Sequence, residues 1–319
     1  AVSMLSLGAG IASSWAAAIY NQTNWILGKL LLGIISFFAS IPGSHFYVGP
    51  PAYSRPETEA VIFDFGAGGA AWIGSGDGQW LIDSGPARFQ NSVLLPFLRS
   101  RGAHALDGLV LTHGDAGHIG SAEALLVRCR PERCITSTCD DRSALRIRLF
   151  AQLEHLGIPK SLHRPGDKVP IGRKAVLQVL YPPPGILRPA ADDKALVVRL
   201  DAGNVRILFL SDGGLFTEEW LRRNCPGDLA ADILVKGSAA GVAGGDPAFL
   251  DAVRPRVVIA TAAAFPEAER IPAAYADAVT KRGIRFFRQD QCGAVTVRIF
   301  SQRCEVTAFL NGRHFEFLH

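Results

Sequence analysis

The segment from Leu109 to Ser121 reads LVLTHGDAGHIGS and constrains the fold more than any other part of the chain. An apolar run typical of a buried strand leads directly into two histidines and one aspartate, and an apolar helical pattern follows over about 120–130. In a helix His113, Asp115 and His118 would not share a face, but a glycine-containing loop after a strand can turn all three inward. The segment therefore predicts a strand, a tight loop and a helix in immediate succession.

This loop has the composition of a metal site. Imidazole nitrogens and carboxylate oxygens are the ligands that divalent transition metals take in proteins. We therefore predict His113, Asp115 and His118 as metal ligands. The alternative is that His113 and Asp115 hydrogen-bond to each other and to the loop backbone, with no metal involved.

The chain around this loop alternates short β-like runs with helical stretches, which is typical of an α/β layered domain. The spacing alone does not separate a doubly wound parallel sheet from two mixed sheets packed face to face. We predict strands at 61–65, 70–74, 79–83, 107–112, 133–137, 175–181, 194–201, 205–211, 231–235, 256–261, 284–288, 293–300 and 304–310. Helices are predicted at 88–101, 120–130, 142–157, 215–224, 247–253 and 272–283.

The first 45 residues differ from the rest in being strongly apolar. Residues 4–20 and 25–41 form two apolar stretches separated by the polar residues 21–24, and each stretch has about the minimum length for crossing a bilayer. Lys29 makes an interfacial position equally compatible with the second stretch. We predict a membrane-spanning or interfacial helical segment over 1–45 and a Pro- and Gly-rich linker over 46–57. A signal peptide is the alternative, although no basic region precedes the apolar stretch.

Charge and cysteine content narrow the function classes. A formal net charge of +4 is compatible with an anionic substrate but is low for a dedicated nucleic-acid binder. The arginines crowded into 128–148 form either a solvated face or a strip that contacts phosphates. Six cysteines without a Cys-x-x-Cys pair exclude zinc-ribbon and thioredoxin-like sites. Three of them, at 129, 134 and 139, are expected either in disulfides or as small buried apolar side chains.

Four stretches in a fixed order carry a resemblance to a known family. In order they are GQWLIDSGP, LDGLVLTHGDAGHIGSAEALL, VRILFLSDGG and ADILVKGSAAG followed by DPAFLDAVRPRVVIAT. Over 58–319 the chain resembles the metallo-β-lactamase-fold domain of ComEC-type DNA-uptake (competence) proteins. The stretch LGKLLLGIISFFASIPGSHFYVGPP also resembles the segment that joins the family's membrane region to this domain. The resemblance implies an αββα sandwich of two mixed sheets with a metal site at one edge.

The resemblance also implies roles for individual residues. His113, Asp115 and His118 match the first, third and sixth positions of the family's His-x-(His/Asp)-x-Asp-His motif, whereas the fifth position is Gly117. Asp83 matches the aspartate that supports the loop by hydrogen bonds. Asp212 stands one place early relative to the bridging carboxylate of the family's Thr-Gly-Asp turn.

Two further ligand stations of the family are replaced. Ser-Ala-Ala-Gly at 238–241 stands where the family has His-His-Gly-Ser, and Arg-Ile-Pro at 270–272 stands where it has Gly-His-Pro. His155 and His163 are the remaining mid-domain histidines and are expected on a helix surface and at a strand edge. We therefore expect an eroded, at most mononuclear site that holds one Zn²⁺ or Mn²⁺ ion or none. Its expected ligands are His113, Asp115, His118 and Asp212, with Asp115 and Asp212 as the catalytic carboxylates.

Three functions follow from this reading. The first is a metal-dependent phosphodiesterase or nuclease that acts on a single DNA strand, and the second is a catalytically inactive domain for DNA binding or channel packing. The third is an unrelated small-molecule metallo-hydrolase, since one fold supports many chemistries. The resemblance implies DNA and the membrane channel of the same protein as partners, with membrane contact through 1–45. It places the chain at the inner membrane with 58–319 in the periplasm.

Overall fold

The computed structural model describes residues 11, 13–40, 55–76, 78–139, 142–186, 192–237, 245–261 and 270–319. The contacts divide the chain into two compact units, Ala1–Pro50 and Pro51–His319. Most of the predicted linker, 46–54, lies outside the described residues.

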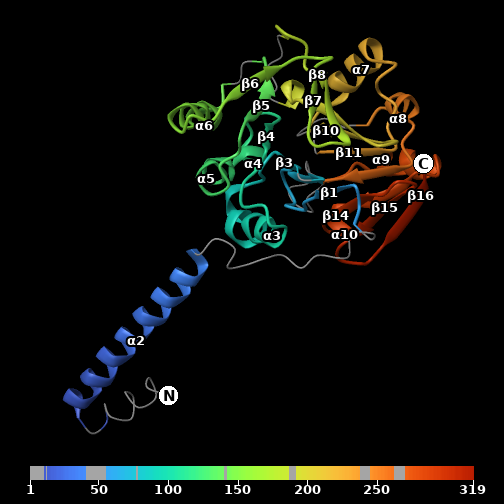
Figure 1. The fold of residues 1–319 in the computed structure, drawn as a ribbon. Coiled ribbons are helices and arrows are strands. Elements are labelled where there is room, and N and C mark those ends of the chain that lie inside the picture. Colours follow the sequence, from blue (N-terminus) through green and yellow to red (C-terminus); the bar gives the residue numbers. More distant parts are fainter. Residues whose placement is uncertain are drawn as a thin grey trace. The chain divides into compact units, whose positions relative to one another are not determined.

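The first unit contains the helix α2, Ser14–Ser40 (Figure 1). Asn21 and its three polar neighbours, which were expected to separate two apolar stretches, lie inside this single helix. Its apolar side chains are exposed along its length, for example Trp25 and Leu32. Within the described part of the chain, no helix combines the length and the hydropathy that crossing a membrane requires.

The second unit is built on two mixed sheets, which confirms the architecture that the family resemblance implied. The first sheet has the strand order β16-β15-β14-β1-β2-β3-β4-β5-β6. Strands β3 to β6 run parallel and the others pair antiparallel. The bounds are β1 Thr58–Ile62, β2 Ala71–Ser75, β3 Gly78–Ile82, β4 Gly108–Leu111, β5 Cys134–Ser137, β6 Lys160–His163, β14 Val295–Ile299, β15 Arg303–Ala308 and β16 His314–Leu318.

The second sheet has the order β13-β12-β11-β10-β9-β8-β7. Strands β10 to β13 are parallel, whereas β7 to β10 form an antiparallel meander. The bounds are β7 Lys168–Pro170, β8 Ala175–Tyr181, β9 Val197–Ala202, β10 Val205–Ser211, β11 Ile233–Lys236, β12 Val257–Ala260 and β13 Arg285–Arg288.

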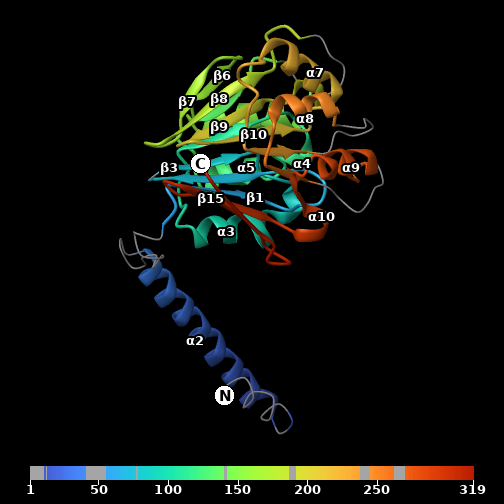
Figure 2. The same ribbon diagram turned by 90° about the vertical axis from the view of Figure 1, so that its right-hand side faces the viewer.

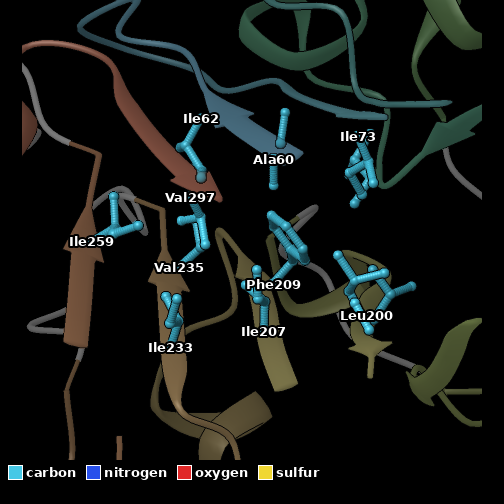
Figure 3. Packing of buried hydrophobic residues seen from close by; sticks show 14 of the residues in the cluster. Ala60, Ile62, Ile73, Leu200, Ile207, Phe209, Ile233, Val235, Ile259 and Val297 are labelled. Carbon is cyan, nitrogen blue, oxygen red and sulfur yellow. The ribbon is translucent and has the colours of Figure 1, made fainter. Parts of the chain in front are cut away.

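Helices cover the outer face of each sheet, which completes four layers (Figures 1 and 2). Strand β10 shows why the chain layers this way: Ile207 and Phe209 point between the sheets, and Leu208 and Leu210 point to the outer helices. Figure 3 shows the core between the sheets, where Ile62 and Val297 of the first sheet face Val235 and Phe209 of the second. The bounds are α3 Leu95–Ser100, α4 Ala116–Ile119, α5 Ala122–Arg128, α6 Ala144–His155, α7 Leu215–Asn224, α8 Pro247–Val253, α9 Ala273–Lys281 and α10 Gln289–Cys292.

Several short elements depart from the sequence prediction. Strands β6, β7 and β16 were not predicted. β6 and β7 are short and carry few apolar residues, whereas β16 has Phe315 and Phe317 at alternate positions facing the core and was overlooked. The predicted helix at 88–101 is a 3₁₀ turn at Ala87–Phe89 and a π turn at Gln90–Leu94 before α3.

The structure shows the state of the cysteines and the position of one arginine of the 128–148 region. All six cysteines are free thiols, and those at 129, 134 and 139 are buried. Arg146 is also buried, and its guanidinium donates to Thr136 Oγ1 at 2.8 Å, so it belongs to neither a solvated face nor a phosphate strip.

Candidate metal centre

A buried carboxylate organises the site from the end of β3. Asp83 accepts hydrogen bonds from the Thr112 N–H at 2.8 Å and the Thr112 hydroxyl at 2.6 Å. The Asp83 Oδ2 atom also lies 2.8 Å from His118 Nδ1, which donates to it because an ionised carboxylate only accepts. Asp83 thereby holds the end of β4 and orients the His118 ring.

Thr112 determines which nitrogen of His113 carries the proton. The Thr112 Oγ1 atom lies 2.9 Å from His113 Nδ1 and accepts from Ser211 Oγ at 3.2 Å. Because the single Thr112 hydroxyl proton goes to Asp83, His113 Nδ1 is the donor in its contact with Thr112. The lone pair of neutral His113 is therefore on Nε2.

Both Nε2 atoms face a carboxylate from the other sheet. Asp212, directly after β10, places Oδ2 at 2.9 Å from His118 Nε2 and at 3.7 Å from His113 Nε2. Both Nε2 atoms are buried, and in the absence of a metal His118 Nε2 pairs with the Asp212 carboxylate. Two imidazole nitrogens and one carboxylate oxygen suit a divalent ion such as Zn²⁺, so these residues fit the metal that the fold implies.

Two sets of ligand atoms converge here to within 4.8 Å, one from Asp83, His113 and His118 and one from His113, Asp192 and Asp212. The oxygens of Asp83 are already engaged by Thr112 and His118. The sequence analysis did not identify Asp192, which lies in the 3₁₀ turn Asp192–Lys194 before β9. The adjacent acidic pair at 192–193 just before a buried strand was its only local signal.

The backbone at this edge is strained on both sheets. Asp83 has φ of 55° and Ser211 has φ of 53°, in the left-handed region that non-glycine residues rarely adopt. Each such residue costs on the order of 1–3 kcal/mol, and such strain is concentrated at functional sites. Asp83 directly follows β3 and Ser211 ends β10, so one left-handed residue lies at the site end of a strand in each sheet.

The pKa shifts describe a compact charge network. Burial by itself lowers the pKa of His118, but the carboxylates of Asp212 and Asp83 outweigh it and raise that pKa well above its usual value. Burial, followed by repulsion from His118, lowers the pKa of His113. Burial acts to raise the pKa of Asp212, but attraction to His118 and His113 brings it below its usual range. Without metal, a proton on His118 therefore balances the two carboxylates.

Asp115, which the sequence analysis predicted as a ligand, caps a helix. It is exposed and directly precedes α4, and its Oδ1 accepts the Gly117 N–H at 2.6 Å as the N-cap of that helix. It lies outside both converging sets of ligand atoms.

Replacing Asp115 with alanine tests this position directly. We expect a loss of about 0.5–2 kcal/mol in the free energy of unfolding, because one cap is removed, and an unchanged metal content. Urea unfolding and elemental analysis of the loaded protein would measure the two effects. Loss of the ion in this variant would instead make Asp115 a ligand.

A contact between two glycine backbones occupies the space beside Gly117. A Cβ on Gly117 would lie 3.0 Å from Gly68 Cα and 2.9 Å from Asp115 Oδ1. Gly68 has φ of +90°, and a Cβ there would lie 2.1 Å from the Gly117 carbonyl oxygen. The chain next to Gly68 also donates to Gly117, from the Gly69 N–H to the carbonyl oxygen at 3.3 Å. The backbone of Gly68 therefore occupies the space that a side chain at residue 117 would need.

A cleft of about 610 Å³ opens over the site, and its lining includes Asp115, Asp192, Asp212, Arg88 and Arg148. A second cavity beside His118 is apolar and has only about 40 Å³. Pockets for small organic ligands have about 300–1,000 Å³, so only the first has the required size.

The comparisons with known proteins agree with this architecture. Residues 63–137 match the family model of the metallo-beta-lactamase superfamily. The metallo-beta-lactamase fold protein YhfI from Bacillus subtilis superposes with a TM-score of 0.52 at 14% identity, covering 72% of this chain and 95% of its own. The chain has the metallo-β-lactamase fold.

Two curated relatives of this metallo-β-lactamase-fold chain are competence proteins. ComE operon protein 3 of Bacillus subtilis (strain 168) is 26% identical over 270 residues, which cover 76% of this chain and 33% of the relative. Competence protein ComA of Neisseria gonorrhoeae is 25% identical over 248 residues, which cover 77% of this chain and 33% of the relative. The chain thus spans about a third of the length of these relatives.

The remaining positions singled out from the sequence lie as follows. Residues 238–241 are outside the described residues. Ile271 packs against the apolar cluster under α9, and Pro272 precedes that helix. His155 ends α6, and His163 lies 3.3 Å from Asp167. Neither histidine belongs to the converging sets of ligand atoms in the described residues.

Proposed function

We propose that this metallo-β-lactamase-fold domain is a metal-dependent phosphodiesterase that acts on single-stranded DNA in a DNA-uptake protein, with one ion at most. The observation that carries the proposal is the convergence of two buried atoms, His113 Nε2 and His118 Nε2, on the Asp212 carboxylate. The competence relatives support DNA as the substrate. A bound Zn²⁺ or Mn²⁺ would supply Lewis-acid polarisation of a phosphoryl oxygen.

The protein's own groups would have separate tasks. His113, His118 and Asp212 would hold the ion, while Asp83 and Thr112 keep both rings oriented through the hydrogen bonds described above. Asp212 and Asp115 line the cleft and are the proposed catalytic carboxylates. Arg88 in the same lining would attract the phosphates of the substrate, whereas Arg148 is paired with Glu123 of that lining at 3.5 Å.

We further propose that the chain belongs to a membrane protein whose channel it contacts, with 58–319 on the periplasmic side of the inner membrane. The competence relatives support this placement. The exposed apolar side chains of α2 support contact between residues 1–45 and an apolar environment.

Metal content tests the catalytic proposal first. After loading with Zn²⁺ or Mn²⁺ and desalting, we expect about one ion per chain by mass spectrometry and none in His113→Ala/His118→Ala. A labelled single-stranded oligonucleotide should then be cleaved by the loaded parent and not by the variant. Absence of the ion from the parent would refute metal-dependent hydrolysis.

A second candidate is DNA binding without hydrolysis. The contact between Gly68 and Gly117 supports it, because it fills the space beside the position where the family has its fifth-position aspartate. Binding of one ion and of DNA without any cleavage would favour this candidate over the first.

A further inference from the structure

A second pocket, remote from the metal centre, lies at the opposite end of β10. It has about 490 Å³ and is lined by the β9–β10 turn, the start of β11 and the end of α8. Arg206 is near the start of β10, whereas Asp212 follows its end. Six residue steps along extended chain separate them by about 20 Å, so this pocket is not part of the cleft.

Three arginines line this pocket, Arg206, Arg254 and Arg256, together with one carboxylate, Asp232. Asp232 Oδ2 accepts the backbone N–H of Arg206 at 3.0 Å, and Oδ1 lies 3.4 Å from Arg256 Nε. Arg256 also donates from Nη1 to the Leu318 carbonyl at 3.1 Å. Asp232 and Arg256 therefore neutralise each other and are held in place.

The other two guanidinium groups have no such partner. Asp201 lies opposite Arg206 in the β9–β10 pairing, but its oxygens are bound by Arg199 at 2.6 and 2.8 Å. Within the described ranges, neither Arg206 nor Arg254 has an acidic side chain within ion-pair distance, and both are exposed. The pocket thus carries two unbalanced positive charges.

The backbone fixes Arg254 at the pocket rim. It caps α8 in the left-handed conformation, with φ of 54° and ψ of 49°, and its N–H donates to Leu250 O at 2.8 Å. Glycine is the usual residue at such a cap, and the left-handed region costs other residues roughly 1–2 kcal/mol. The cap fixes the backbone of Arg254, so its exposed side chain extends from a defined position on the pocket rim.

We propose that this pocket is a binding site for phosphate groups, with Arg206 and Arg254 as its contacting residues. A guanidinium matches two phosphate oxygens with two parallel N–H donors, and two unbalanced arginines would neutralise a dianionic segment. Asn204 in the β9–β10 turn adds an amide donor to the same lining. The phosphates come from either a nucleic-acid strand or a free phosphate compound, and the site uses no residue of the metal centre.

Binding measurements on the full chain in EDTA test the site without any contribution from metal. We would measure the anisotropy of a fluorescein-labelled oligo(dT) and, by calorimetry, the binding of inorganic pyrophosphate. In Arg206→Gln/Arg254→Gln we expect at least tenfold weaker oligonucleotide binding. The salt dependence should also become shallower by about 1.4 in log–log slope, for two lost contacts to a single strand.

A charge-matched control separates the pocket from the overall charge. Arg99→Gln/Arg128→Gln removes the same two charges from a different pocket and should change binding less than twofold. Loss of pyrophosphate binding alone in the Arg206/Arg254 variant would support the site and assign it to a free phosphate compound. Parent-like binding of both probes by that variant, with an unchanged melting temperature, would overturn the proposal.

Metal content separates this proposal from the proposed catalytic function. Arg206→Gln/Arg254→Gln should bind as many ions per chain after loading as the parent does, because no residue lining the pocket belongs to the converging ligand sets among the described residues. A parent that binds no ion, together with weaker oligonucleotide binding in this variant, would refute metal-dependent hydrolysis and leave the pocket proposal standing. Loss of the ion along with the oligonucleotide in this variant would contradict a separate phosphate site.

Discussion

A chain carrying Gly117→Asp is expected to bind no more metal than the parent and to lose stability. The substitution puts an aspartate at the family's fifth motif position, but its Cβ would lie 3.0 Å from the Gly68 Cα. Forcing extra atoms into a well-packed place costs about 1–3 kcal/mol. The new carboxylate would also lie beside that of Asp115, and two like charges at short range destabilise each other.

Urea unfolding and metal stoichiometry would measure these two effects. Gly227→Asp is the matched control, because a Cβ on Gly227 would meet no atom within 4 Å. The control should unfold within about 0.5 kcal/mol of the parent, as surface substitutions usually do. A second bound ion in Gly117→Asp at parental stability would show that the 66–69 loop moves aside, and would contradict the steric argument.

Replacing Glu218 with glutamine should destabilise the fold by about 3–5 kcal/mol, the usual cost of breaking a buried ion pair. Glu218 in α7 lies 2.9 Å from Lys236 Nζ at the end of β11, and both side chains are buried. Glu218 also accepts the Asp246 N–H at 2.7 Å. The variant keeps an acceptor for that N–H but leaves the Lys236 ammonium without its counter-charge.

The double variant Glu218→Gln/Lys236→Met isolates this cause. Because it removes the unpaired charge, it should recover most of the lost stability in urea unfolding. Glu219→Gln on the same helix breaks only the exposed pair with Arg223 and should cost less than about 1 kcal/mol. Equal losses in the single and double Glu218 variants would mean that the uncompensated charge is not the cause.

Strands were predicted correctly from the sequence where a short segment consists almost entirely of apolar residues. Strand β4, which precedes His113, and strand β10 are covered on both faces of their sheets. Nearly all their residues are therefore apolar, and these apolar runs identify the strands directly. The αββα layering came from the family resemblance, because spacing alone left a doubly wound sheet as an alternative. Short strands such as β6 were missed, since Lys160 and Ser161 give it little apolar signal.

The site was predictable only in part, because its decisive contacts are between segments far apart in the chain. His113 and His118 stand out in one loop, but the role of Asp192 depends on the second sheet bringing it to His113. Asp115 matches a ligand position in sequence, yet local helix geometry uses its carboxylate as a cap. The contact of Gly68 with Gly117 has no sequence signal at all, because it joins two loops through backbone atoms.

The candidate ligands directly follow the ends of strands that belong to two different sheets. His113 and His118 follow β4, whereas Asp212 follows β10, and Ser211 Oγ donates across to Thr112 Oγ1 at 3.2 Å. Anything that binds all three ligands therefore fastens the first half of the domain to the second. Its binding free energy would add to the cohesion between the halves, so slower amide exchange in both sheets at once would reveal occupancy before any reaction was observed.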